Sequence, residues 1–337
     1  MKKTIIKGTG RYVPPRLVTN EDLSQWMDTS NEWIIQRTGI EQRYWIPEGG
    51  GVGASDLGFE ASKIAMDRSG WAPEDIDLII FATLSPDIFF PGSGCLLAHK
   101  LGLSSTPALD IRQQCTGFLY GMATADAYIR SSMAKRVLLV GAEVHSTGLD
   151  ISTRGRDVAV IFGDGAAAVC LERMETDIKL GVLSSCLHAD GSLAESLMTF
   201  APASRENPRL DENMLKEGKH FPTMDGRNIF KNAVRRLPEV AGEAIKKAGI
   251  PMTAVDLFIP HQANLRINQA FAKALDLPES KVYNNIQRYG NTTAASIPLA
   301  LDEAIEKGLV GAGSTVMFLG LGAGVTWGAV LYRFAAK

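Results

Sequence analysis

The sequence contains no long hydrophobic run and little net charge. No stretch of about 18 apolar residues occurs, so a membrane-spanning helix is not expected. The N-terminal segment MKKTIIKGTG breaks at Gly8 and Gly10, too early to form the apolar region of a signal peptide. A net charge of −2 gives no global field that would attract nucleic acid or an anionic membrane. These absences predict a soluble, cytoplasmic protein.

The four cysteines show no spacing typical of a metal site. Cys95, Cys115, Cys170 and Cys186 form no CxxC pair and accompany no paired histidines. A disulfide framework, a zinc site or any other metal centre is therefore not expected. The composition, with 45% hydrophobic and 21% charged residues, is that of an ordinary globular protein. At 337 residues, the chain can form two domains or one large duplicated fold.

An internal duplication is visible in the sequence. Residues 65–80 (AMDRSGWAPEDIDLII) match residues 244–259 (AIKKAGIPMTAVDLFI) without a gap, and the same spacing aligns RVLLVG (136–141) with TVMFLG (315–320). Further along, AVCLER (168–173) resembles AVLYRF (329–334). Three matches in order predict two similar halves, residues 1–175 and 176–337.

Helices and strands are expected to alternate in each half. Apolar spacing predicts helices over 55–70 and 228–248, and buried strands over 77–83 and 256–260. Such alternation predicts mostly parallel sheets with helices on both faces. Residues 190–225 interrupt the pattern with polar residues and prolines, which indicates a long excursion near the site or an interface.

Three polar residues, far apart in the sequence, are candidates for one site. Cys115 in QQCTGF lies between an expected strand and a long amphipathic helix, where free N–H groups and the helix dipole favour a thiolate. His261 directly follows the strand DLFIP, at the edge where α/β sheets bind ligands. Asn291 lies in the loop YGNT. Taken singly, these could be a core cysteine, a strand-capping histidine and a turn asparagine. Together, they could take an acyl group and join a carbon atom to it.

The segment FLGLGAGVTWG (318–328) is a glycine-rich turn after a strand. It lacks the helix and the lysine of a phosphate-binding loop, and its continuation is typical of a strand. We therefore interpret it as a turn that brings backbone N–H groups close to a reacting carbonyl group.

The motifs QQCTGF, FGDGAAA, HQANLRI, YGNTTAAS and GAGVTWG, together with TSNEWIIQRTGI at 29–40, resemble the β-ketoacyl-acyl-carrier-protein synthase III family. This family belongs to the thiolase-like condensing enzymes. The resemblance implies an α/β, thiolase-like duplicated fold, with two similar halves in a five-layered αβαβα arrangement. Cysteine with histidine and asparagine distinguishes the family from thiolases, which use a second cysteine, and from elongating synthases, which use two histidines.

The resemblance also implies a reaction. Acyl-coenzyme A would acylate Cys115, and decarboxylative condensation with malonyl-acyl carrier protein would give 3-oxoacyl-acyl carrier protein, coenzyme A and CO2, the first step of fatty acid biosynthesis. His261 and Asn291 would face the incoming thioester carbonyl, and the backbone N–H groups of Cys115 and Ala323 would form an oxyanion hole. Coenzyme A is a substrate here, and no cofactor is expected. Alternatives are an acyltransferase or a specialised-metabolite ketosynthase with another acceptor or a longer acyl chain, and a non-catalytic protein that binds acyl carriers.

The family pattern further implies residues that bind substrates and a partner subunit. Coenzyme A or the acyl carrier protein would contact Trp33, Arg37, Arg156, Asn264 and Arg266. Phe90 would close the acyl pocket of the partner subunit in a homodimer. Phe90 favours a short acyl chain, whereas Val325 and the 190–225 excursion are compatible with a longer or branched one.

Overall fold

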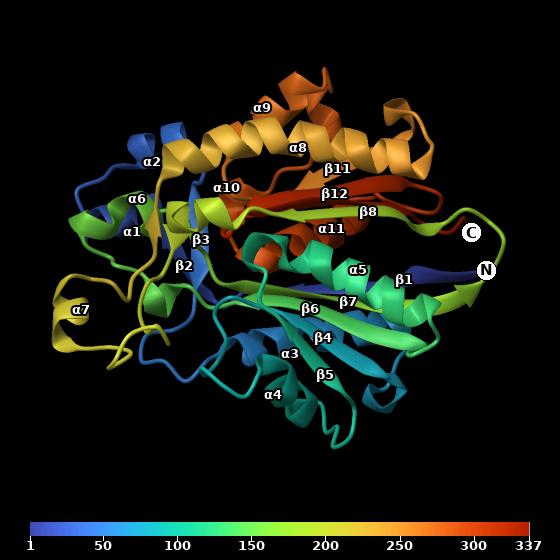
Figure 1. Ribbon diagram of the computed structural model, residues 1–337, viewed down its shortest axis with the longest axis horizontal. Helices are drawn as coiled ribbons and strands as arrows, with labels where there is room; N and C mark the ends of the chain where they lie inside the picture. Colours follow the sequence, from blue (N-terminus) through green and yellow to red (C-terminus); the bar gives the residue numbers. More distant parts are fainter. Residues whose placement is uncertain (337) are drawn as a thin grey trace.

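Two β-sheets are stacked with helices between them and on both outer faces, which gives five layers (Figure 1). The computed structural model describes residues 1–336. One sheet contains, in order, β1 (Lys2–Tyr12), β7 (Gly165–Glu175), β6 (Arg136–Glu143), β4 (Leu78–Ala82) and β5 (Ala108–Ile111). The other contains β8 (Gly181–Ala189), β13 (Thr326–Arg333), β12 (Thr315–Gly322) and β11 (Leu257–Pro260). The predicted αβαβα fold is confirmed.

The strand order confirms the duplication. The repeated sequence segments correspond to β6 and β12, to β7 and β13, and to β4 and β11. When the first sheet is counted from β1 and the second from β8, the two members of each pair occupy the same position. In place of β5, the second sheet has a single parallel bridge between Phe258 and Val282. The first sheet lies within residues 2–175 and the second within 181–333, on either side of the predicted division of the chain. That division into domains stays a prediction.

The expectation of mostly parallel sheets is wrong. Four of the seven strand pairings in the two sheets are antiparallel, namely β1–β7, β6–β7, β12–β13 and β13–β8. Only three residues separate β12 from β13, and a parallel neighbour needs a crossover of about a dozen residues or more. Both sheets are therefore mixed, with their parallel pairs around β4 and β11.

The outer helices begin and end close to the predicted positions. Helix α3 (Ala54–Ser69) ends at Gly70, and helix α8 (Gly226–Ala248) ends at Gly249; both glycines are left-handed, with φ of 67° and 64°. The remaining helices are α1 (Asn20–Ser24), α2 (Asn31–Thr38), α4 (Ser93–Lys100), α5 (Gly117–Arg130), α6 (Arg156–Ala159), α7 (Glu212–Lys216), α9 (Leu265–Ala274), α10 (Ile286–Tyr289) and α11 (Ser296–Glu306).

Helices α5 and α11 form the middle layer between the sheets (Figure 1). Helix α11 is buried without interruption from Ser296 to Ala304, because sheets cover it on both sides. On α5, the ring of Phe118 meets that of Phe318 on β12 edge to face, with centroids 5.6 Å apart. The two halves thus share one hydrophobic core, and the start of each central helix lies inside it.

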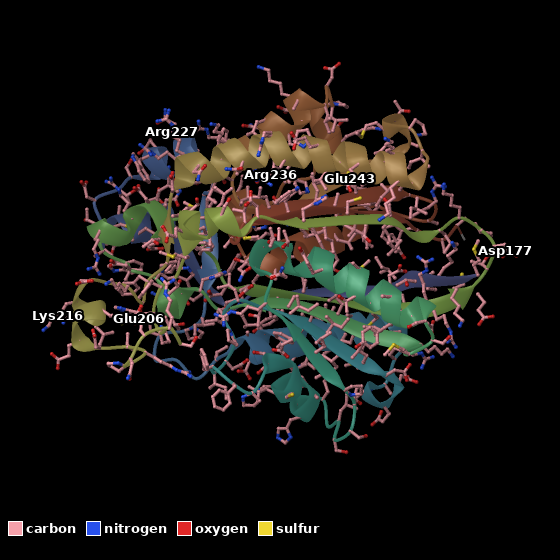
Figure 2. All side chains as sticks on the ribbon, viewed as in Figure 1. Asp177, Glu206, Lys216, Arg227, Arg236 and Glu243 are labelled. Carbon is pink, nitrogen blue, oxygen red and sulfur yellow. The ribbon has the colours of Figure 1, made fainter. Side chains whose placement is uncertain are left out.

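The 190–225 excursion packs beside the start of α8. It contains a 3-10 turn (Gly191–Ser196), the short paired strands β9 (Leu197–Met198) and β10 (Thr223–Met224), and α7. Its base is held by the ion pair of Asp190 with Arg236 on α8, 2.7 Å long. Figure 2 shows Glu206 and Lys216 at the edge of the molecule, far from Arg236.

A second small module near α2 pairs β2 (Arg16–Thr19) with β3 (Gln42–Trp45). Within residues 1–336, no helix has both the length and the apolarity to cross a membrane.

Candidate active site

Cys115 lies in a 3-10 turn (Gln114–Thr116) between β5 and the first turn of α5, at the predicted strand-to-helix junction. The turn packs closely against β12. A Cβ atom added to Gly322 would lie 2.6 Å from the Cβ of Cys115 and 3.0 Å from its sulfur. Any side chain larger than hydrogen at position 322 would therefore displace the thiol.

His261 follows the last residue of β11, as predicted, and lies against the same strand β12. A Cβ atom added to Gly320 would lie 3.1 Å from the Cβ of His261 and 3.6 Å from the carbonyl oxygen of Cys115. Gly320 and Gly322 are two residues apart on one strand and so face the same side. The structure thus packs the predicted cysteine and histidine against the same face of β12, where Gly320 and Gly322 have no side chains.

The His261 ring has one satisfied nitrogen and one free nitrogen. Its Nδ1 lies 2.6 Å from the hydroxyl of Ser296, while Nε2 is buried and has no hydrogen-bond partner in the described part of the chain. Burial lowers the pKa of His261 to about 3, and the nearby His145 adds to this effect. The imidazole is therefore neutral at pH 7, and its Nε2 is left without a hydrogen-bond partner among the described residues.

Asn291 follows α10, after Gly290 with a φ of 65°. Its side-chain oxygen accepts a hydrogen bond of 2.9 Å from the backbone N–H of Thr293, which leaves the amide NH2 group free to donate. The next turn (Thr293–Ala295) packs on the start of α5, where a Cβ added to Gly117 would lie 3.1 Å from that of Ala294. The Asn291 loop is thus held against the Cys115 turn.

The resting thiol differs from the sequence-based expectation. Burial raises the pKa of Cys115 to about 12, and the carboxylate of Glu143 adds to the rise. Hydrogen bonds to the sulfur from the backbone N–H groups of Ala323 and Cys115 oppose the rise without cancelling it. The helix N-terminus therefore does not hold a thiolate at neutral pH, because desolvation outweighs it. The protein at rest carries a neutral thiol and a neutral imidazole at this site.

The neutral state of the thiol predicts how the reactivity of Cys115 changes with pH. In a Cys95→Ser background, which removes an exposed thiol, the rate of Cys115 alkylation by iodoacetamide should rise about tenfold per pH unit from pH 7 to pH 10, because the thiolate fraction does so below the pKa. The rate is read by peptide mass spectrometry. A plateau reached by pH 8 would show that the site stabilises the thiolate, contrary to this account.

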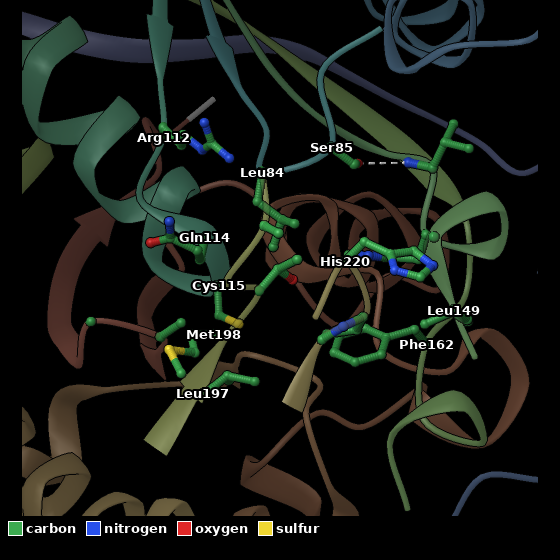
Figure 3. A pocket seen from close by; sticks show the side chains of 18 of the residues that line it. Leu84, Ser85, Arg112, Gln114, Cys115, Leu149, Phe162, Leu197, Met198 and His220 are labelled. Carbon is green, nitrogen blue, oxygen red and sulfur yellow. Dashed lines mark hydrogen bonds between the residues drawn. The ribbon is translucent and has the colours of Figure 1, made fainter. Parts of the chain in front are cut away.

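A cavity of about 510 Å³ opens at Cys115, a size typical of small-molecule sites. Its wall is mainly apolar, with Leu84, Val144, Leu149, Phe162, Leu197 and Met198, and also includes Ser85, Arg112, His145, His220 and the turn Ala323–Gly324. In Figure 3, Arg112, Gln114 and Cys115 lie on one side, and His220, Leu149 and Phe162 on the other. His261 and Asn291 are not among the described residues that line this cavity. The 190–225 excursion supplies Leu197, Met198 and His220, so it forms part of the wall.

The residues predicted to bind coenzyme A form a cluster on α2 and its neighbours. The guanidinium groups of Arg37 and Arg156 lie 4.4 Å and 4.8 Å from the ring centroid of Trp33. Asn264 caps α9 and donates a 2.9 Å hydrogen bond to the carbonyl oxygen of Arg37. Arg266 lies over Phe230, 5.6 Å from the ring centroid. The structure brings Trp33, Arg37, Arg156 and Asn264 together, and the binding roles of all five residues stay predictions.

Phe90 does not line the cavity of its own chain, whereas its neighbour Phe89 does. The Phe90 side chain is 77% exposed, and Ile88 and Phe89 beside it are also exposed. The prediction that Phe90 reaches the pocket of a partner subunit therefore concerns a second chain and stays a prediction.

Sequence reasoning missed several polar residues of the site. Ser296 contacts His261 across 35 positions of sequence, and no local pattern signals that contact. Glu143 accepts hydrogen bonds from Thr83, Leu84, Ser85 and Ala294, and burial raises its pKa to about 7. A signal did exist for Glu143 and His145, because EVHS begins at the last residue of the apolar strand β6, much as HQAN directly follows β11.

Two duplicated, stacked sheets, with a cysteine at the start of a central helix that packs against the histidine-bearing and asparagine-bearing segments of the other half, define a thiolase-like condensing enzyme. Comparison with known families and structures agrees. Residues 109–191 match the family model described as 3-oxoacyl-[acyl-carrier-protein] synthase III, and residues 245–334 match that of its C-terminal part.

Solved structures match over nearly the whole chain. The 3-oxoacyl-[acyl-carrier-protein] synthase III from Aquifex aeolicus VF5 is 42% identical, with a TM-score of 0.88, over 98% of this chain and 100% of that one. The β-ketoacyl-[acyl carrier protein] synthase III from Thermus thermophilus is 39% identical, with a TM-score of 0.90, over 99% and 100%. The priming β-ketosynthase of the R1128 polyketide pathway is 29% identical, with a TM-score of 0.89, over 99% and 97%. The chain belongs to the 3-oxoacyl-acyl-carrier-protein synthase III family, and it is an acyl-transferring condensing enzyme of fatty acid synthesis.

Proposed function

We propose that acyl-coenzyme A acylates Cys115 and that the acyl-enzyme then condenses with malonyl-acyl carrier protein, with the loss of CO2. The observation that carries this proposal is that Cys115 and His261 pack against the same face of β12, at Gly322 and Gly320 respectively. The thiol opens into a cavity able to hold an acyl chain. Beside it, the free ring nitrogen of His261 and the free amide of Asn291 supply polar groups for a second substrate.

In the first step, Cys115 loses its proton to Nε2 of His261 as the sulfur attacks the thioester carbonyl. Both groups are neutral at rest, and their shifted pKa values disfavour a free thiolate–imidazolium pair, so the proton transfer is concerted with the attack of the sulfur on the carbonyl. The carbonyl oxygen becomes an oxyanion, which the backbone N–H groups of Cys115 and Ala323 stabilise. The bond to the coenzyme A sulfur then breaks, and the leaving thiolate takes the proton from His261.

In the second step, the malonyl thioester loses CO2, and the electrons of the broken carbon–carbon bond move onto its thioester oxygen. Donation from Nε2–H of His261 and from the amide of Asn291 stabilises this enolate. The enolate carbon attacks the acyl carbonyl on Cys115, and the sulfur leaves as a thiolate and takes a proton from solvent. The product is a 3-oxoacyl thioester. No step in this sequence uses a metal ion or a redox cofactor.

The two steps need opposite forms of His261. Nε2 accepts a proton in the first step and donates a hydrogen bond in the second. A hydroxyl group both donates and accepts, so Ser296 can hydrogen-bond to Nδ1 in either tautomer. We therefore assign Ser296 a positioning role toward His261.

Ser296→Ala should lower kcat by about tenfold, the upper range for one neutral hydrogen bond, with little change in KM for acyl-coenzyme A. The matched control is Ser62→Ala, which also removes a buried hydroxyl, one that bonds the carbonyl of Gly58. Steady-state kinetics of both variants, compared across pH, give the result. A normal kcat in Ser296→Ala, or an equal loss in the control, would remove the assignment.

The recognition of the two substrates is proposed from surface features. The Trp33, Arg37 and Arg156 cluster offers an aromatic face and two cations to the coenzyme A nucleotide. Arg266 at the start of α9 would help to dock an acidic carrier protein. The exposed segment Ile88–Phe90 offers apolar contact area for a second copy of the chain, with Phe90 reaching its pocket.

A ketosynthase of specialised metabolism is the second candidate function. It is favoured by the similarity to the R1128 priming ketosynthase. Both candidates share the Cys115 chemistry and differ in the acyl group and in the carrier protein. A comparison of condensation rates with carrier proteins from fatty acid and polyketide synthesis separates them.

A further inference from the structure

The acyl cavity carries more polar groups than an alkyl chain can use. Two histidines, His145 and His220, and the cation of Arg112 contribute to its wall. No aspartate or glutamate is among the described residues that line it. A saturated acyl chain would cover the two imidazole rings and offer them no hydrogen bond.

His145 is almost fully buried beside the cavity, with 8% of its surface exposed. Its Nε2 lies 2.7 Å from the hydroxyl of Thr293, and its ring packs against Phe162, with centroids 4.6 Å apart. Burial lowers the pKa of His145 to about 3, so the ring is neutral and Nδ1 is its remaining polar atom. Thr293 and Phe162 fix the ring, so Nδ1 is held in one place.

His220 comes from the excursion and lies across the cavity from Cys115 (Figure 3). Its ring packs on Phe221, with centroids 3.9 Å apart. Its Nδ1 is buried and has no hydrogen-bond partner in the described chain. A buried polar atom without a partner is costly to a protein and marks a place where a ligand can supply the missing bond.

Arg112 lies at the end of β5, on the Cys115 side of the cavity (Figure 3). Its permanent positive charge, with no lining carboxylate to balance it, favours oxygen atoms that accept hydrogen bonds. The imidazoles and the guanidinium come from three separate segments of the chain, and all of them line the same space.

We propose that the acyl group accepted by Cys115 carries a hydrogen-bonding oxygen, as a hydroxyl group or a carboxylate, at the end remote from its thioester, and that His145 and His220 bind this oxygen. The proposal rests on the proposed function, because it names the acyl substrate class of the same nucleophile.

The test uses three coenzyme A thioesters with the same five-carbon chain, namely pentanoyl, 5-hydroxypentanoyl and glutaryl, with acetyl-coenzyme A as a probe of the nucleophile. Initial rates of Cys115 acylation are read by intact-protein mass. At least one oxygenated thioester should acylate the protein ten or more times faster than pentanoyl. A faster hydroxypentanoyl reaction would identify a neutral ligand, and a faster glutaryl reaction, lost in Arg112→Ala, would identify a carboxylate.

In His220→Phe, with or without His145→Leu, the ratio of the oxygenated-thioester rate to the pentanoyl rate should fall at least fivefold. The control is His188→Phe, a histidine that stacks on Trp327 outside the cavity wall. Acylation by acetyl and pentanoyl at rates equal to or above those of the oxygenated thioesters would overturn this inference and leave the proposed function intact. No acylation by any of the four would overturn both.

Discussion

Replacing Cys115 with alanine will abolish the acyl-enzyme and leave the fold intact. The side chain sits between β12 and the start of α5, where Gly322 leaves room for it, so the smaller alanine fits without strain. No other group in the proposed mechanism can hold the acyl chain. Incubation with acyl-coenzyme A and intact-protein mass spectrometry should show one added acyl group in the wild type and none in Cys115→Ala.

The matched control for this experiment is Cys170→Ala. Cys170 is fully buried on β7, within the hydrophobic core of the first half, so its loss should lower stability while acylation proceeds. Circular dichroism checks that both variants fold. A full acyl mass increment on Cys115→Ala would show that another residue is the nucleophile.

The second large effect concerns His261 and Asn291. His261→Ala and Asn291→Ala should each slow decarboxylation by about 10²–10³-fold, the cost of removing one oxyanion donor. Self-acylation should fall less, because the backbone N–H groups of Cys115 and Ala323 still serve that step. Release of CO2 from the malonyl thioester and the rate of acyl mass gain measure the two steps separately.

Asn268→Ala is the control for Asn291→Ala. Asn268 is another buried asparagine, and its side chain bonds Asn284 on the outer face of the second sheet. It should leave both rates unchanged. If the Asn291 variant lost acylation and decarboxylation equally, the amide would not act on the malonyl group in particular.

Much of the fold could be predicted because the relevant signals are local. The match of residues 65–80 with 244–259 corresponds to α3–β4 and α8–β11, and the matched strands occupy the same positions in both sheets. The strand directions could not be predicted in the same way. An apolar run shows that β13 is buried, but only the short turn after β12 makes it antiparallel.

The site was predictable where single residues follow strands or open helices. Cys115 and His261 lie at such positions, and the structure places them against one strand. The protonation state of Cys115 was not predictable, because its pKa depends on burial by segments from both halves. The polar residues of the cavity wall were also not predictable, since His220 comes from the 190–225 excursion, whose sequence has no regular apolar spacing.

The most direct test of the central claim follows one enzyme sample through both steps. Purified protein is acylated with acyl-coenzyme A, freed of excess reagent and mixed with malonyl-acyl carrier protein, while intact mass and CO2 are recorded together. We expect the mass of the acyl group to disappear from Cys115 at the same time as one equivalent of CO2 and one equivalent of 3-oxoacyl thioester appear. Transfer of the acyl group to the carrier protein without CO2, or release of CO2 with the acyl group still on Cys115, would contradict it.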